Sequence, residues 1–175
     1  METKTDLRII KTEKVIREAF MTLRKKTPLE KMKVSEICKT AMINPSTFYK
    51  HYSDVIALSE SIENDLVHKC LKDHCNTDCL FTDPYRYLMS FQQTLLKNEE
   101  ELNIVFAGRQ GVMLEKTERI MRAHYLSGNV DEETKVKVIF AMGGIIHTST
   151  VLNRNQDYPA EELCRLLANL IHKLA

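Results

Sequence analysis

Apolar residues recur with helical spacing along almost the whole chain, and this pattern constrains the fold more than any other feature. Val34, Ile37, Cys38 and Ala41 stand at positions i, i+3, i+4 and i+7, which places them on one face of a helix of about two turns. Residues 136–140 are rich in β-branched side chains, but the helical spacing around them and the lack of a partner strand favour helix. The sequence therefore predicts an all-α fold of about nine helices.

Helix-breaking and helix-capping residues divide this pattern into separate helices. Pro28 ends the first helix, and residues 44–45 and 83–84 each place a capping Asn or Asp before a first-turn proline. The short helix 45–52 follows the first of these caps, and a longer one then runs to about residue 74. The helices expected after it are residues 84–98, 99–109, 111–126, 134–152 and 159–174.

The distribution of charge splits the chain near residue 58. The whole chain carries 25 basic and 24 acidic residues, a net charge of +1, which on its own gives no indication of a nucleic-acid partner. Residues 1–58 hold 12 basic and 7 acidic residues, whereas residues 59–175 hold 13 and 17. A basic head on an acidic body indicates nucleic-acid contact at one end. We predict a DNA-binding domain over residues 1–58 and a larger helical domain over residues 59–175.

The ends of the chain and its cysteines predict a cytoplasmic protein without a membrane partner. The N-terminal residues alternate charges and lack the apolar stretch of a secretory signal. The longest apolar run, residues 138–146, is about half as long as a membrane span requires. Five cysteines form an odd number without the density of a disulfide scaffold, which fits a reducing compartment.

Residues 33–52, KVSEICKTAMINPSTFYKHY, have the pattern of a helix–turn–helix. In such a motif the first helix packs across the second, and the second is short enough to enter the major groove of DNA. Phe48 and Tyr52 are four residues apart and are expected to face the core together. The other side chains of the second helix carry hydroxyl, imidazole and ammonium groups, which bond phosphate oxygens and base edges; they are Ser46, Thr47, Tyr49, Lys50 and His51.

Residues 41–58 resemble the TetR family of bacterial transcription regulators. The resemblance rests on the run Thr-Phe-Tyr-x-His-aromatic at residues 47–52, followed by Ser-Asp and a leucine at position 58. Both glycines of the family's motif are absent, because Met42 and Ser46 stand in their places. A turn residue with positive φ favours glycine, so Met42 predicts a strained or slightly different turn. The lysine usual near the start of the next helix is also missing, which leaves Lys50 or Lys33 to take over part of its phosphate contact.

The resemblance implies a three-helix DNA-binding unit and double-stranded operator DNA as its partner. It implies phosphate-contacting or helix-positioning roles for Thr47, Tyr49 and His51. It also makes Pro45, Ser46 and Lys50 the candidates for contacts with base edges. Packing of Tyr49 and His51 against the first helix, and a merely solvated Lys50, remain alternatives. The full set of candidate DNA-binding residues is Lys33, Ser35, Pro45, Ser46, Thr47, Tyr49, Lys50 and His51.

The last two helices, 134–152 and 159–174, are the most apolar of the chain. The resemblance implies that they form a four-helix bundle with the same helices of a second copy, and residues 143–144, both glycine, would let another helix approach closely. Packing within one subunit is the alternative. A homodimer also suits DNA recognition, because two recognition helices related by a two-fold axis read a palindrome.

The resemblance further implies a pocket for a small effector among the middle helices. Its candidate lining residues are Tyr85, Met89, Phe91, Phe106, Met113, Met121, Tyr125 and His147. Methionine suits an adaptable cavity, although methionine and aromatic residues at helical spacing more often form ordinary core. No pattern of buried charge names a ligand class.

A cluster of soft ligands is formed by His68, Cys70, His74, Cys75 and Cys79. Thiolates and imidazoles at this density bind Zn²⁺ or Cu⁺ or act as a redox sensor in other proteins. The cluster has no C-x-x-C pair, and residues two apart diverge by about 200° around a helix. We therefore predict a polar cluster near a helix end, with no metal site and no cofactor.

These observations favour a dimeric transcription regulator, a repressor released from a palindromic operator by a small effector. The alternative is an activator or co-regulator whose body docks a partner protein. A cavity of ligand size would favour the first interpretation and a filled body the second. No nucleophile, base or glycine-rich motif stands in a catalytic context, so we do not expect an enzyme.

Overall fold

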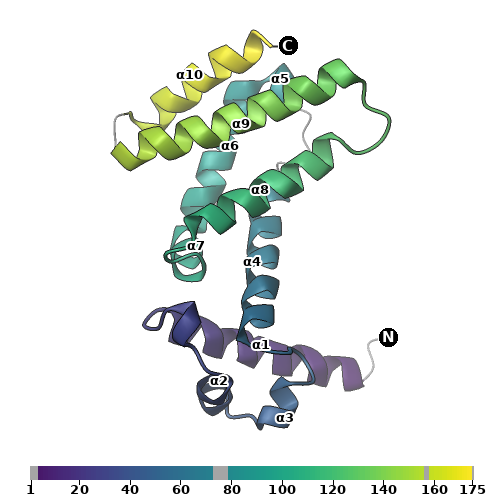
Figure 1. Cartoon of the computed structure of the whole chain (residues 1–175), viewed down its shortest axis with the longest axis vertical. Helices are drawn as coiled ribbons and strands as arrows, with labels where there is room; N and C mark the ends of the chain where they lie inside the picture. Colours follow the sequence, from purple (N-terminus) through teal and green to yellow (C-terminus); the bar gives the residue numbers. More distant parts are fainter. Residues whose placement is uncertain (1–3, 73–78, 156–157, 175) are drawn as a thin grey trace. The chain divides into compact units, whose positions relative to one another are not determined.

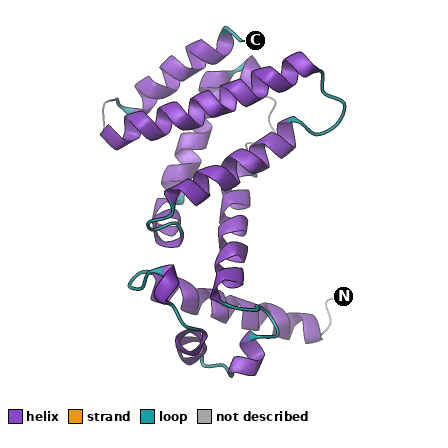
Figure 2. Ribbon diagram, viewed as in Figure 1, coloured by secondary structure: helices purple, strands orange, loops and turns teal. Residues whose placement is uncertain are grey.

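The computed structural model describes residues 4–72, 79–155 and 158–174, and every regular element in these ranges is a helix (Figures 1 and 2). This confirms the predicted all-α fold. Ten α-helices and one 3-10 helix occur in the described ranges, against about nine helices predicted. The additional elements are the one-turn helix α5, Cys79–Thr82, and the 3-10 helix η1, Leu29–Lys31. Both are too short for hydrophobic periodicity to reveal.

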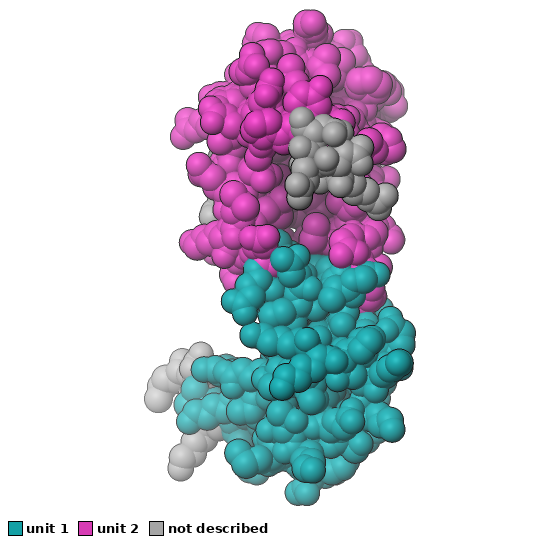
Figure 3. Space-filling model, turned by 90° about the vertical axis from the view of Figure 1, so that its left-hand side faces the viewer, with its two compact units in different colours: residues 1–65, 100–108 teal, residues 66–99, 109–175 magenta. Residues whose placement is uncertain are grey.

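The chain divides into two compact units (Figure 3). Unit 1 consists of residues 1–65 and 100–108, and unit 2 of residues 66–99 and 109–175. Residues 1–58, the predicted DNA-binding domain, lie within unit 1. The same unit includes the first part of the following helix and one segment from much later in the sequence.

Unit 1 is built around helix α1, Lys4–Arg24, on which helix α2, Val34–Ala41, packs. The short helix α3, Pro45–Phe48, contacts α2, and helix α4, Val55–Leu71, begins in this unit. The fully buried side chains of its core include Ile16, Phe20, Ile37, Phe48 and Leu58. Burying a side chain of this size stabilises a fold by roughly 1.5–3 kcal/mol, so this core holds α2 and α3 in place.

Residues 100–108, which include most of helix α7, Glu99–Val105, complete unit 1 at the end of α1. The buried Arg24 donates hydrogen bonds from Nη2 to the carbonyl of Ala107, at 2.7 Å, and from Nη1 to the carbonyl of Thr27, at 3.3 Å. The end of α1 is thereby tied to a segment 83 residues later in the chain.

Unit 2 contains helices α6, Pro84–Lys97, α8, Gln110–Tyr125, α9, Glu132–Asn155, and α10, Ala160–His172. Helix α10 packs mainly against α6, and α8 packs against α9. The four helices correspond to the predicted helices 84–98, 111–126, 134–152 and 159–174, with ends that differ by at most three residues.

Capping side chains set the first residues of α6 and α9. The Asp83 carboxylate accepts a hydrogen bond from the backbone N–H of Arg86 at 3.1 Å. The Asp131 carboxylate accepts from the backbone N–H of Thr134, at 2.9 Å, and from its hydroxyl, at 2.7 Å. These bonds to Thr134 hold the pKa of Asp131 below its ordinary value, because they stabilise the ionised form. Both caps satisfy backbone donors that a helix start otherwise leaves free.

Candidate nucleic-acid interface

The turn between α2 and α3 begins at Met42, whose backbone is left-handed with φ 54° and ψ 45°. The N–H of Met42 donates to the carbonyl of Lys39 at 3.3 Å, and the N–H of Ile43 donates to the carbonyl of Cys38 at 3.0 Å. This pair of bonds is the Schellman motif, which ends a helix sharply and favours glycine at the left-handed position. Met42 is the single non-glycine residue with positive φ in the described ranges. The strain predicted for this turn is therefore present.

Replacing Met42 with glycine is expected to raise the free energy of unfolding by about 0.5–1 kcal/mol. Glycine adopts the left-handed conformation without the Cβ penalty, which outweighs its greater freedom in the unfolded chain. Little packing is lost, because the Met42 side chain is 91% exposed. Urea denaturation followed by circular dichroism measures the change, with Met42→Ala as the matched control that keeps the Cβ. Equal stability of the alanine and glycine variants would contradict this origin of the strain.

The recognition segment, residues 45–52, is helical over a shorter stretch than predicted. Regular α-helix ends at Phe48, whereas the sequence predicted a helix to Tyr52. The N–H of Lys50 donates to the carbonyl of Thr47 at 3.3 Å, and that of His51 donates to the carbonyl of Phe48 at 2.9 Å. These are bonds between residues three apart, whereas the N–H of Tyr52 donates to the carbonyl of Phe48, four residues earlier, at 3.0 Å. The segment therefore continues after Phe48 as a turn with both 3-10 and α-type bonds.

The recognition segment buries two aromatic side chains and exposes most of the others. Phe48 is fully buried and Tyr52 nearly so, which confirms that both face the core. Tyr49 is 58% exposed, and its ring meets the edge of Phe48 with centroids 5.6 Å apart. Pro45, Ser46 and Lys50 are exposed, whereas Thr47 and His51 are half-buried. The half-buried His51 ring lies 6.3 Å from that of Tyr52, which agrees with a partly structural role for this residue.

A polar cluster, the Arg17 network, fixes the end of the recognition segment to α1 and α4. The Tyr52 hydroxyl donates to the Glu13 carboxylate at 3.0 Å and accepts from Nε of Arg17 at 3.3 Å. Arg17 also reaches the Asp65 carboxylate and the Ser61 hydroxyl, both at 2.7 Å. Burial alone would lower the pKa of the Arg17 guanidinium, but the bonds and attraction from Tyr52 and Asp65 outweigh it and raise the pKa. The guanidinium therefore stays charged at the centre of the network.

Three exposed lysines of the helix–turn–helix have no ion-pair partner among the described residues. Lys33, Lys39 and Lys50 are exposed and form no ion pair with the described part of the chain, whereas Lys14 and Arg17 on α1 are paired with glutamates. Ammonium groups without a partner in the chain are available to pair with phosphates. Lys33 is also the N-cap residue of α2, where its N–H donates to the Glu36 carboxylate at 3.3 Å. Ser35, two residues further along the chain, is exposed.

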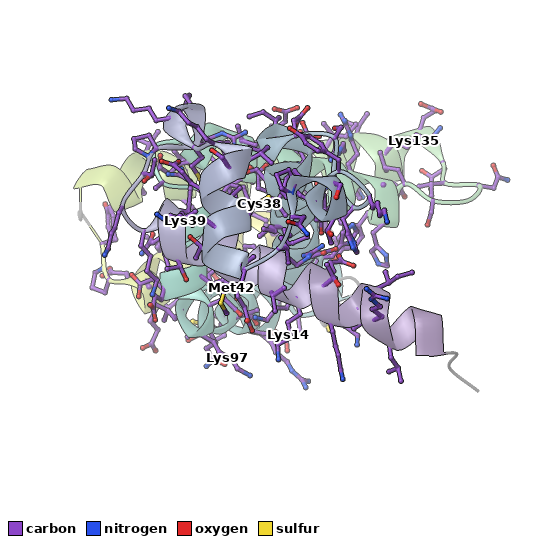
Figure 4. The ribbon with its side chains drawn as sticks, turned by 90° about the horizontal axis from the view of Figure 1, so that it is seen from below. Lys14, Cys38, Lys39, Met42, Lys97 and Lys135 are labelled. Carbon is purple, nitrogen blue, oxygen red and sulfur yellow. The ribbon has the colours of Figure 1, made fainter. Side chains whose placement is uncertain are left out.

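A groove of about 480 Å³ lies where the turn end of α2 approaches α1 (Figure 4). Its polar lining comes from Arg8 and Thr12 on α1, Lys39 on α2, and Asn44 and Thr47 around the start of α3. Arg8, Thr12, Lys39 and Asn44 are not among the DNA-contact residues predicted from the sequence. Hydrophobic periodicity could not predict that these residues lie together, because it does not show which residues of α1 meet the turn.

Unit 2 contains a cavity of about 590 Å³ between α6, α8, α9 and α10. Two predicted pocket residues, Phe91 and Met113, line it. The other six candidates lie outside its lining: Tyr85, Met89, Phe106, Met121, Tyr125 and His147. Phe106 is buried in unit 1, and His147 is exposed on α9. Helical spacing shows which face of a helix is apolar but not which neighbour that face meets.

The cluster of cysteines and histidines is only partly described. His74 and Cys75 lie outside the described residues, while His68 is exposed, Cys70 buried and Cys79 half-buried. Within the described ranges no three metal-ligating side chains gather into one group.

Helices α9 and α10 expose apolar side chains on unit 2. On α9 these are Val136, Ile139, Phe140 and Val151, with the exposed Gly143 and Gly144 between them, and on α10 they are Leu166 and Leu170. Among the described helices, residues 132–152 of α9 also have the length and mean hydropathy, 1.2, that a membrane crossing requires. Charged side chains occupy the first two turns of α9, where Lys135 and Lys137 pair with Glu132 and Glu133.

The fold is similar to that of a solved transcription-regulator structure. The structure described as "Dihydroxyacetone kinase operon activator DhaS" matches with a TM-score of 0.54 over 93% of this chain and 94% of that chain, at 20% sequence identity. At this identity the likeness establishes a shared all-α fold. No family model and no curated protein sequence matches the chain.

Proposed function

We propose that the protein is a dimeric, sequence-specific DNA-binding transcription regulator. The observation that carries the proposal is the recognition segment, which anchors Phe48 and Tyr52 in the core and leaves Ser46, Tyr49 and Lys50 exposed. A short helix held in this way, with free lysines around it, has the chemistry that reads base edges and neutralises phosphates. We assign it to the TetR family on the motif at residues 47–52.

The dimer forms through α9 and α10. The exposed residues Val136, Phe140, Gly143 and Val151 are spaced along one face of α9, and a monomer would leave that face in water. A second copy, related by a two-fold axis, presents the same face and covers it. The two recognition segments of the dimer then meet two half-sites of a palindrome.

Binding of a small effector in the cavity of unit 2 regulates the contact with DNA. The cavity is of the size that small-molecule sites have. Gln110 and Gly111, which line it, follow directly after the segment that Arg24 holds to the end of α1 through Ala107. A ligand that displaces the first turn of α8 therefore also shifts the preceding residues, which Arg24 holds in the DNA-binding unit.

The regulator acts as a repressor, and the effector releases it from its operator. The name of the similar structure favours a second candidate function. That protein is described as an operon activator, so activation of transcription is the alternative for this chain. Transcription in vitro from a promoter that contains the selected site distinguishes the two. Repression predicts less transcript when the protein is added, and activation predicts more.

Selection from a random pool of duplexes tests the proposal itself, and Tyr49→Phe tests the recognition segment. We expect a palindromic site to be enriched, and we expect Tyr49→Phe to weaken binding of that site and of random duplex by the same factor, about tenfold. The variant removes only the exposed hydroxyl, which donates to a phosphate and not to a base, a loss of about 1–1.5 kcal/mol.

Filter binding at several salt concentrations measures this loss. Lys26→Ala is the control variant of unit 1, because Lys26 is exposed and forms no ion pair with the residues that the structure describes. Failure to retain any palindromic duplex at low salt would overturn the proposed function. An altered site preference of Tyr49→Phe with unchanged binding of random duplex would instead assign its hydroxyl to a base edge.

A further inference from the structure

The cavity of unit 2 has a lining without any charged side chain. Seventeen residues from four helices contribute to it, and none of them is Asp, Glu, Lys, Arg or His. The one thiol, that of Cys164, is held neutral because burial raises its pKa. This neutrality contrasts with the chain as a whole, of which 28% is charged.

Uncharged hydrogen-bonding groups are set into this apolar lining. Gln92 on α6 and Gln110 on α8 supply amides, and Thr117, Ser149 and Thr150 supply hydroxyls. The Thr150 hydroxyl donates to the carbonyl of Ile146 at 2.7 Å, which leaves its oxygen to accept a further bond. Leucine, isoleucine, methionine and phenylalanine side chains make up most of the rest.

A charged ligand would lose its hydration here without gaining a counter-charge. Burial of an unpaired ion is among the most costly events in a protein, whereas amides and hydroxyls are suited to a neutral polar group. Apolar surface of the ligand gains by leaving water for the leucine and isoleucine side chains. The lining therefore selects against both cations and anions.

We propose that the cavity binds an uncharged, mainly apolar small molecule that carries a hydroxyl, carbonyl or amide group. This inference rests on the proposed function, in which the molecule is the effector. The volume of about 590 Å³ fits a ligand of two or three fused or linked rings.

Two fluorescent probes with the same skeleton test the ligand class. N-phenyl-1-naphthylamine is uncharged, and 8-anilino-1-naphthalenesulfonate adds one sulfonate to the same rings. Titration of the full-length protein is expected to show one site per chain for the neutral probe, and binding of the sulfonate at least about tenfold weaker. Equal affinities of the two probes would overturn the proposed class.

Gln92→Arg places a cation in the lining and is expected to reverse the preference, so that the sulfonate binds more tightly than the neutral probe. The matched control is Gln93→Arg, which adds the same charge at the exposed neighbouring residue outside the lining and is expected to leave both affinities unchanged. Gln110→Arg, at an exposed position of the lining on another helix, repeats the test if Gln92→Arg does not fold. The same response from Gln93→Arg and the lining variants would place the probe elsewhere.

Operator binding, measured separately, distinguishes failure of this inference from failure of the proposed function. If the protein retains a palindromic duplex but binds neither probe, the proposed ligand site is wrong and the proposed function as a regulator stands. A protein that binds the neutral probe selectively but retains no duplex keeps the site and loses the proposed function.

Discussion

Phe140→Glu is expected to produce a folded monomer that binds its operator about 10²–10⁴-fold more weakly than the dimer does. This range is the gain that linking two binding modules brings, and the variant loses it when the two half-sites are no longer bound together. Phe140 is 67% exposed, so its replacement removes little packing within the chain. In the proposed dimer the glutamate and its symmetry mate would be buried without a partner.

Analytical ultracentrifugation and operator titration measure the two effects. Leu96→Glu on α6 is the matched control, because Leu96 is also an apolar residue of unit 2 and is 58% exposed, but lies outside α9 and α10. It is expected to leave both the dimer and the affinity unchanged. A Phe140→Glu protein that still dimerises would place the interface on another surface. A wild-type protein that is monomeric in water but binds to phospholipid vesicles would assign the apolar face of α9 to a membrane.

Local signals in the sequence predicted the helices well. Asp83 and Asp131 stand before helical spacing, and both accept the hydrogen bonds of an N-cap in the structure. Met42 stands where a turn favours glycine, and its φ is positive as expected. These features are legible because the residues that cause them lie within four positions of the residues they affect.

Features that depend on contacts between distant residues were not predictable in this way. Ile56 is an apolar residue in the first turns of α4, but it is 48% exposed, because Val55 and Leu58 set the face of α4 that meets the core. Of the apolar candidates for the effector pocket, Phe91 and Met113 line the cavity of unit 2. The polar lining, with Gln92 and Ser149, was missed because a glutamine or serine in a helix reads as a surface residue.

The candidate DNA interface illustrates the same division. The motif at residues 47–52 identified the exposed side chains of the recognition segment, since their spacing within one short helix decides which face they take. Arg8 and Lys39 lie near these side chains only because α1 approaches the turn. The Arg17 network likewise forms only because α1 and α4 come together. No sequence motif marks this network, although its bonds to Tyr52 hold the end of the segment in place.

Arg17→Met is therefore expected to lower the free energy of unfolding by about 2–3 kcal/mol, the loss typical of hydrogen bonds to charged groups. Methionine keeps the unbranched stem but leaves the Glu13 and Asp65 carboxylates and the Tyr52 hydroxyl without their common donor. Arg17→Lys keeps the charge but not the planar fork, so we expect an intermediate loss. Since Tyr52 ends the recognition segment, Arg17→Met is also expected to weaken operator binding.

Urea denaturation of the two variants measures the stability, and Lys14→Met is the matched control on the same helix. The pair between Lys14 and Glu18 is exposed and its atoms are 3.8 Å apart, so its loss is expected to cost less than about 0.5 kcal/mol. A loss in Arg17→Met no larger than that in Lys14→Met would show that the network does not stabilise unit 1. If stability falls but operator affinity relative to random duplex is unchanged in the folded variant, the network holds the fold without orienting the recognition segment. We expect both stability and relative operator affinity to fall, because the Arg17 guanidinium binds the Tyr52 hydroxyl at the end of the segment as well as the Asp65 carboxylate on α4.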